Sequence, residues 1–146
     1  MSPNQRIPNG FTLLEVLFVL ALLSIILLLL PPINVEVMEK QQEEQFLETF
    51  KFDVLYVQSM SNLITNEEVF IRLYKDNYKI LRGSTETIAE RTYPPGLVID
   101  SRGNNDISFN STGTFFYPRT IRITTKHNDY NAVFQLGKGR FYIAEK

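Results

Sequence analysis

An apolar run of 20 residues, from Phe11 to Leu30, constrains this chain more than any other feature. Its only polar side chains belong to Thr12, Glu15 and Ser24. A helix rises about 1.5 Å per residue, so a run of this length reaches about 30 Å, the thickness of the hydrocarbon core of a bilayer. We therefore predict a transmembrane helix over residues 11–33.

Glu15 is unexpected in this run, because an acidic side chain inside a bilayer costs roughly 2.5 kcal/mol or more and needs a partner or water. The run contains no basic residue. A positive partner would exist if the chain were cut between Gly10 and Phe11, since the new main-chain amine would lie one helical turn from Glu15. The carboxylate would also lie in the first turn of the helix, where the helix dipole favours negative charge.

The order Gly10-Phe11-Thr12-Leu13-Leu14-Glu15 resembles the class III signal of type IV pilins and pseudopilins. The resemblance implies that a membrane aspartyl peptidase cuts after Gly10 and methylates the new terminal amine of Phe11. It also implies that Glu15 pairs with the terminal amine of an adjacent subunit during assembly. Two opposite charges in lipid cost less free energy as a pair than they do apart, which agrees with this assignment.

Three other interpretations of the run compete with this one. The apolar part of a secretory signal peptide has at most about 15 residues and ends at small residues, whereas this run is longer and ends at Pro31 and Pro32. A plain signal anchor would leave Glu15 unexplained, and a buried core helix fits the length less well. The two prolines predict a kink or break near Leu30, and the pilin resemblance implies that the helix resumes beyond it.

Residues 34–64 are predicted to form an amphipathic helix that continues the first segment into one long helix. Apolar residues recur there at helical spacing, at Phe46, Phe50, Val54 and Val57. Acidic side chains crowd the first part of this helix, and we expect them to be solvated or to face other subunits. They are Glu36, Glu39, Glu43, Glu44 and Glu48.

Residues 65–146 are predicted to form a β-rich globular domain. Short runs of strand-forming residues are separated by turn signals such as Pro94-Pro95-Gly96. The predicted strands are 68–74, 78–82, 85–93, 97–99, 107–109, 120–125, 132–136 and 140–143. Only one amphipathic helix is available to cover a sheet, so the predicted fold class is α+β, with the long helix packed on an antiparallel meander.

No feature of the chain indicates catalysis, so we expect a structural protein that needs no cofactor and no metal. The sequence has no cysteine and a single histidine, His127, which lies in a polar stretch at 127–131. A single histidine without any cysteine cannot supply the ligands of a typical zinc site. We expect His127 to be an exposed residue of a turn. Gly137-Lys138-Gly139 lacks the rest of a phosphate-loop pattern and is predicted to be a hairpin turn.

Basic residues are concentrated toward the C-terminus. Residues 101–146 hold 7 Lys+Arg against 3 Asp+Glu, while residues 1–100 hold 8 against 13. A strip formed by Arg122, Lys126, Lys138 and Arg140 could neutralise DNA phosphates. Basic residues on an exposed sheet face are more often simply solvated. The strip therefore has two interpretations, contact with DNA and solvation.

The β-rich part is similar to the minor pseudopilins of the Gram-positive competence machinery. The similarity lies in residues 90–97, 107–113, 120–123 and 137–140. A more distant resemblance to H-type minor pseudopilins of type II secretion, and to FimT-like minor pilins that bind DNA, remains an alternative. A single-pass anchored surface module that binds a ligand alone is the alternative from a different class.

The competence resemblance implies a subunit of a pseudopilus that takes up transforming DNA across the cell wall. The implied partners are other competence pseudopilins, major and minor, a prepilin peptidase, a polytopic membrane platform protein and, indirectly, an assembly ATPase. The leader 1–10, with Arg6 as its one cation, would stay cytoplasmic. The C-terminal domain would lie outside the cell membrane and, after assembly, at the cell surface.

Overall fold

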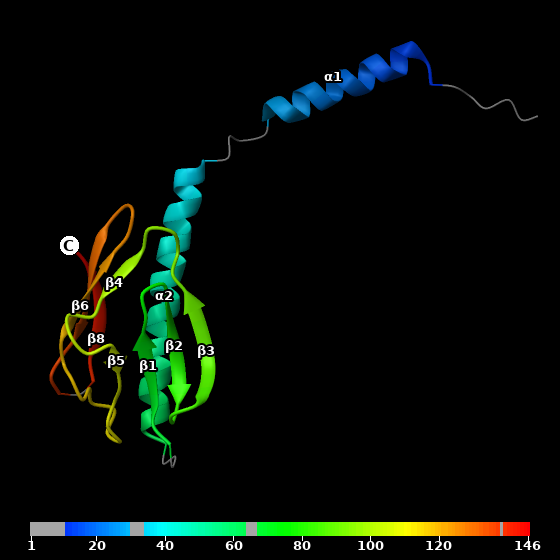
Figure 1. The fold of residues 1–146 in the computed structure, drawn as a ribbon. Coiled ribbons are helices and arrows are strands. Elements are labelled where there is room, and N and C mark those ends of the chain that lie inside the picture. Colours follow the sequence, from blue (N-terminus) through cyan, green and yellow to red (C-terminus); the bar gives the residue numbers. More distant parts are fainter. Residues whose placement is uncertain (1–10, 30–33, 64–66, 138) are drawn as a thin grey trace, which may run out of the picture. The chain divides into compact units, whose positions relative to one another are not determined.

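The computed structural model describes residues 11–29, 34–63, 67–137 and 139–146 (Figure 1). The chain divides into two compact units, Met1–Asn34 and Val35–Lys146. Each unit is described by itself.

The first unit contains α1 (Leu13–Leu29), within which no residue is buried. Among the helices that the structure describes, none combines the length and the apolar character needed to cross a membrane. The predicted break at Pro31 and Pro32, and with it the continuity of one long helix, lies outside the described residues. The leader 1–10 also lies outside them.

The second unit begins with α2 (Val35–Ser61), within the predicted bounds of 34–64. The apolar stripe predicted from helical spacing is confirmed, because Phe50, Val54 and Val57 are fully buried and Phe46 is nearly so. Two acidic side chains of α2, Glu43 and Asp53, are buried as well. The prediction that Glu43 is solvated or faces other subunits is therefore wrong.

Eight strands follow in the described part of the second unit. They are β1 (Val69–Leu73), β2 (Asn77–Arg82), β3 (Glu86–Thr92), β4 (Val98–Asp100), β5 (Asp106–Ile107), β6 (Thr120–Thr124), β7 (Asp129–Phe134) and β8 (Phe141–Glu145). The strand regions were predicted, but β7 begins three residues earlier than expected. Asp129 and Tyr130 extend a strand that the sequence had placed in the polar turn 127–131.

The strands form two antiparallel four-stranded sheets, in the orders β3-β2-β1-β5 and β4-β6-β7-β8. The predicted single meander is therefore wrong. After β3 the chain crosses to the second sheet for β4, returns to the first for β5, and crosses again. These pairings are long-range: Ile107 lies opposite Ile71, and Ile99 lies opposite Ile123. Ile71, Ile107 and Ile123 of these pairs are buried in the core.

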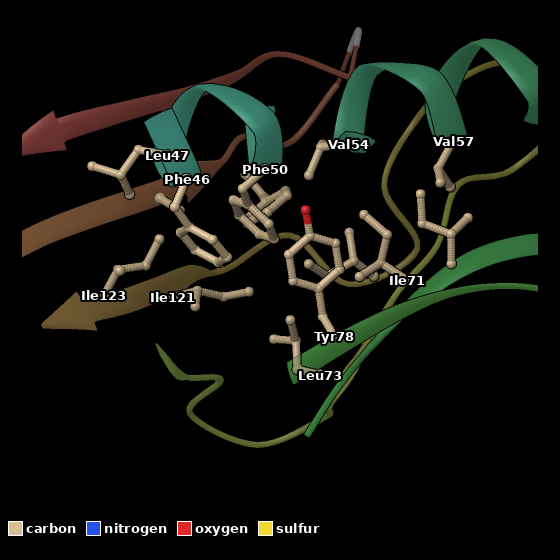
Figure 2. Packing of buried hydrophobic residues seen from close by; sticks show 14 of the residues in the cluster. Phe46, Leu47, Phe50, Val54, Val57, Ile71, Leu73, Tyr78, Ile121 and Ile123 are labelled. Carbon is tan, nitrogen blue, oxygen red and sulfur yellow. The ribbon is translucent and has the colours of Figure 1, made fainter. Parts of the chain in front are cut away.

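α2 packs against both sheets, and Phe50 contacts an aromatic ring from each. Figure 2 shows Phe50 beside Tyr78 in the buried cluster. The ring of Tyr78 in β2 lies 5.3 Å from that of Phe50, in edge-to-face geometry. The ring of Phe141 in β8 lies 6.3 Å away, also edge to face. The α+β class with the helix packed on antiparallel sheets is therefore confirmed, with two sheets in place of one.

Gln58, near the C-terminal end of α2, connects two turns of the β-rich part. Its Nε2 donates to the carbonyl oxygens of Gly113, at 2.8 Å, and Gly139, at 2.9 Å. Gly139 belongs to the predicted hairpin turn between β7 and β8, which is confirmed by the antiparallel pairing of these strands. Lys138 lies outside the described residues.

Substituting Gly139 with Ala tests this connection. Gly139 has φ +57°, and an added Cβ would overlap both Gly113 O and Gln58 Nε2. We expect Gly139→Ala to lower the free energy of unfolding of residues 35–146 by roughly 2–3 kcal/mol, because strain and overlap add. Gly137→Ala is the matched control, since its φ is +76° but nothing lies within 4 Å of the added Cβ. Urea unfolding followed by circular dichroism measures both, and equal losses would contradict the proposed overlap.

Candidate functional site

The first turn of α1 is built around Thr12 and Glu15. Thr12 precedes the helix and caps it, because its Oγ1 accepts a hydrogen bond from the backbone N–H of Glu15 at 3.3 Å. Its carbonyl oxygen accepts from the N–H of Glu15 at 3.1 Å and from that of Val16 at 3.2 Å. Thr12-Leu13-Leu14-Glu15 therefore has the spacing of a capping box, with the acid at the third helical position.

This arrangement places the Glu15 carboxylate in the first turn, as predicted from the sequence. Phe11 lies directly before the cap and is 82% exposed. Gly10 lies outside the described residues, so the cleavage position, the methylated residue and the assembly role of Glu15 stay predictions.

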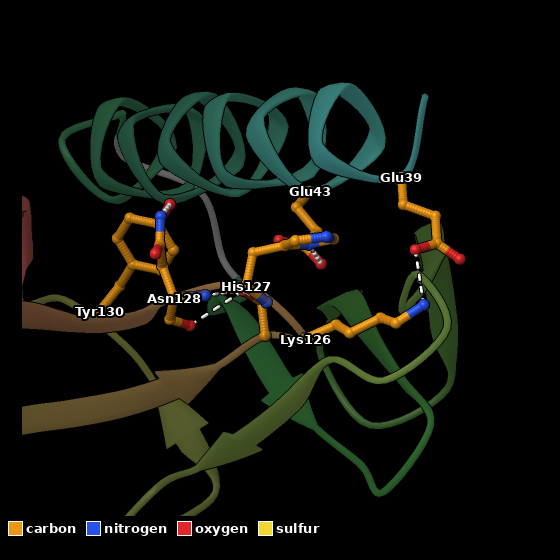
Figure 3. Close-up of polar contacts among 7 residues, drawn as sticks. Glu39, Glu43, Lys126, His127, Asn128 and Tyr130 are labelled. Atoms are coloured by element: carbon orange, nitrogen blue, oxygen red, sulfur yellow. Dashed lines mark hydrogen bonds and ion pairs between the residues drawn. The ribbon is translucent and has the colours of Figure 1, made fainter. Parts of the chain in front are cut away.

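The second unit contains a buried acid–imidazole contact between α2 and the turn that joins β6 to β7 (Figure 3). Glu43 is 3% exposed, and its Oε1 lies 2.9 Å from Nδ1 of His127. The His127 side chain is only 19% exposed, so the prediction of an exposed turn histidine is wrong. The backbone N–H groups of His127 and Asn128 donate to Oγ1 of Thr125, which fixes the turn that presents the imidazole.

Lys126 in the same turn pairs with Glu39, one helical turn before Glu43 on α2 (Figure 3). Its Nζ lies 2.6 Å from Oε2 of Glu39. The hydrogen bond from Lys126 lowers the pKa of the Glu39 carboxyl, and the same bond raises the pKa of Lys126. Two acids of the predicted solvated face of α2 therefore hold one turn of the second sheet.

Asp53 forms the corresponding contact between α2 and the first sheet. Its Oδ2 accepts from the hydroxyl of Tyr78 in β2 at 2.7 Å and from Nε of Arg91 in β3 at 3.1 Å. Burial, followed by the hydrogen bond to Asp53, raises the pKa of Tyr78 above its ordinary value. The hydrogen bond to Asp53 likewise raises the pKa of Arg91. The buried carboxylate thus has both a neutral donor and a cation.

The predicted basic strip for DNA is only partly assembled. Arg122 in β6 donates from Nη2 to Asp129 at 2.7 Å, and Lys126 lies beyond the end of β6, paired with Glu39. Arg140 is exposed beside the β7–β8 turn, and Lys138 lies outside the described residues. Two of the four predicted cations therefore already have a carboxylate partner, with which a phosphate would compete.

Sequence reasoning missed the buried contact between Glu43 and His127. It also missed the contacts that Asp53 and Gln58 make with the β-rich part. Glu43 and Asp53 share one face of α2 with the apolar stripe, since each lies three or four residues from Phe46 or Phe50. Helical spacing assigns both positions to the apolar face, and this placement could have predicted that the two acids point into the core. The described residues contain no group of three or more His, Cys, Asp or Glu side chains that could hold a metal ion.

Comparison with known proteins places these features in a family. Residues 6–31 match the prokaryotic N-terminal methylation motif. Over 143 residues the chain is 32% identical to competence protein ComGD of Bacillus subtilis (strain 168), and the alignment covers 94% of each chain. The chain belongs to the ComGD family. No solved structure matches it.

Membership in the ComGD family confirms the resemblance to competence pseudopilins that the signal and the β-rich part predicted. The matched motif, residues 6–31, contains the capped first turn of α1. The match to ComGD extends across both units of the structure. The family assignment therefore includes the globular domain as well as the N-terminal segment.

Replacing His127 with Ala tests the contact between α2 and the β6–β7 turn. The variant leaves the carboxyl group of Glu43 buried without its hydrogen-bond partner, so we expect the free energy of unfolding of residues 35–146 to fall by about 2 kcal/mol. Adding Glu43→Leu removes the buried polar group that has lost its partner and should restore most of this loss. Lys126→Ala, which breaks a more exposed pair in the same turn, is the control and should have a clearly smaller effect. Similar losses in the two single variants, measured by urea unfolding, would contradict the assignment.

Proposed function

We propose that this chain is a minor pseudopilin, a structural subunit of a competence pseudopilus that transports transforming DNA across the cell wall. A prepilin peptidase cleaves it after Gly10 and methylates Phe11. It then enters the filament through its N-terminal helix. Its role is positional, not enzymatic, and needs no cofactor.

The arrangement around Glu15 carries the proposal. The residues that match the methylation motif include Gly10 and the whole of α1. Thr12 caps the helix two residues after the cleavage position, and Glu15 lies in the first turn. Cleavage would create an amine at Phe11, and the amine of one subunit can pair with the Glu15 carboxylate of the next. A carboxylate in an apolar assembly is stable only with such a partner.

We propose a location in the cell membrane before assembly. The apolar run from Phe11 to Leu30 is long enough for the hydrocarbon core when it is entirely helical. The β-rich unit lies on the outer side, and the assembled subunit lies in the cell wall and at the cell surface. The partners are other major and minor pseudopilins, the peptidase and a polytopic platform protein, with an assembly ATPase acting indirectly.

The full-length identity to ComGD favours competence over the type II secretion and FimT-like alternatives. The intrachain pairing of Arg122 and Lys126 gives no support to direct DNA contact through the predicted strip. In this proposal the protein therefore serves DNA uptake through the filament and not through a nucleic-acid site of its own.

Mass spectrometry of the mature N-terminus tests the processing step. In cells that contain the peptidase, we expect the chain to begin at Phe11 and to carry one methyl group on its terminal amine. In cells that lack the peptidase, the chain should keep residues 1–10. A chain that begins at Met1 in both strains would overturn the proposed processing.

Glu15→Val tests the assembly step. The variant removes a charge that opposes membrane insertion by roughly 2.5 kcal/mol, so insertion and cleavage should be at least as complete as in the parent. Incorporation into filaments should fall by about 100-fold or more, because the terminal amine of the neighbouring subunit loses its buried partner. Transformation should fall with it.

Glu44→Val is the matched control, since Glu44 is an exposed acid on α2. This variant should keep both filament incorporation and transformation. A chain that tolerates Glu15→Val equally well would be a simple membrane anchor, and the assembly role would be wrong.

A further inference from the structure

Thr12 marks the start of α1. It is not itself helical, yet its carbonyl oxygen accepts hydrogen bonds from the backbone N–H groups of Glu15, at 3.1 Å, and Val16, at 3.2 Å. Its Oγ1 accepts a further bond from the N–H of Glu15 at 3.3 Å. A residue with these three features is an N-cap, and the helix begins at the residue that follows it.

Phe11 is consequently left outside the helix. It is 82% exposed, and no backbone hydrogen bond joins it to another described residue. In the proposed processing, the peptidase adds water across the bond between Gly10 and Phe11. Gly10 then ends in a carboxylate, and Phe11 begins with a free amine. The amide nitrogen of the bond that breaks therefore belongs to a residue that α1 does not include.

The sequence offers two earlier starting points for this helix. Asn9 and Gly10 are both residue types that are accepted at N-caps, and asparagine ranks at least as high as threonine there. A helix that began at either residue would include Phe11 in its first turn. The carbonyl of Gly10 would then accept the N–H of Leu14, because each helical bond spans four residues. That carbonyl is the group that water must attack, so an earlier start would place the scissile bond inside hydrogen-bonded helix.

Thr12 competes well with these earlier starts because of the residue three positions after it. Threonine at the N-cap with glutamate at the third helical position is the combination of a capping box. A start at Asn9 would place Thr12 at the third position, and a start at Gly10 would place Leu13 there. Neither threonine nor leucine has the carboxylate or amide that a capping box uses. The local sequence thus favours the start that the structure shows.

We propose that Thr12 is a positioning residue for leader removal. Its cap holds the start of α1 at Leu13 and so keeps Phe11 in non-helical backbone, where the peptidase can bind it. Exposed segments outside regular structure are the preferred sites of proteolysis. Without the cap, the start moves back to Asn9 or Gly10, and the scissile bond enters the helix. The inference rests on the proposed function, because it assumes that the chain is cleaved after Gly10.

Direct recognition of the Thr12 hydroxyl by the peptidase is the competing explanation, since this side chain is exposed. The two explanations differ for asparagine, which caps a helix at least as well as threonine but has no hydroxyl. Serine keeps both the cap and the hydroxyl. Valine has nearly the shape of threonine and keeps neither. A series of substitutions at this one position therefore separates capping from recognition.

The initial rate of leader removal from the purified full-length chain, in detergent micelles with purified peptidase, tests the inference. Thr12→Val should slow cleavage by about fivefold, the shift in population expected from the loss of a cap. Thr12→Ser and Thr12→Asn should be cleaved at the rate of the parent chain. Ser24→Val is the matched control, because the Ser24 hydroxyl donates to the carbonyl of Leu20 at 2.8 Å, within α1. This variant should leave the rate unchanged.

NMR of the uncleaved chain in the same micelles is a second measurement that needs no peptidase. The Cα chemical shift of Phe11 should be non-helical in the parent and in Thr12→Asn, and it should move toward the helical value in Thr12→Val. Cleavage of Thr12→Val at the parent rate, slow cleavage of Thr12→Asn, equal slowing by Ser24→Val, or an unchanged shift at Phe11 would overturn the inference. A parent chain that the peptidase does not cut would instead contradict the proposed function.

Discussion

Phe50 of α2 packs against an aromatic ring from each of the two sheets, and the arrangement of the globular unit depends on this contact. Tyr78 of β2 and Phe141 of β8 meet its ring edge to face, which is a favoured geometry for aromatic pairs. Phe50 itself is completely buried. Neither sheet has another described helix to cover its core face, so α2 covers both sheets, and Phe50 is in ring contact with each of them.

Polar contacts then fix the position of α2 along and around its axis. Apolar packing is largely non-directional, so a helix held by its apolar stripe alone could shift on the sheets. Asp53 meets Tyr78 and Arg91 of the first sheet, and Glu43 meets His127 beside the second. Each buried carboxylate is costly without its partner. Any shift of α2 on the sheets would separate these buried acids from their partners, and this cost favours the observed position of the helix.

The sequence predicted the elements of this fold better than their connections. Helical spacing found the buried stripe from Phe46 to Val57, and alternation with turn signals located the strand regions. These signals are local, because they reflect the geometry of one helix or one strand. The pairing of β1 with β5 and of β4 with β6 depends on contacts between distant segments, which no local pattern encodes.

The same limit explains the errors at the polar residues. Glu43 and His127 are 84 positions apart in the chain, and each looked like a solvated residue in its own surroundings. Arg122 and Lys126 looked like members of one basic strip until their carboxylate partners were placed beside them. Thr12 and Glu15, by contrast, are three residues apart, and the first-turn position of that carboxylate followed directly from the sequence.

The two units differ in what they need from other molecules. The globular unit buries its own apolar side chains, whereas α1 buries none, and residues such as Leu13 and Leu28 remain at least 80% exposed. Exposed apolar surface on this scale is typical of a segment that lipid or other protein chains cover. Lipid or an apolar protein surface would bind α1 regardless of which apolar residues the helix carries, because the hydrophobic effect has little directional preference. Glu15 changes this, since a carboxylate in apolar surroundings needs a cation at one defined position. In the proposed filament, one acid in the first turn would therefore give an otherwise non-specific apolar helix a fixed axial register with its neighbour.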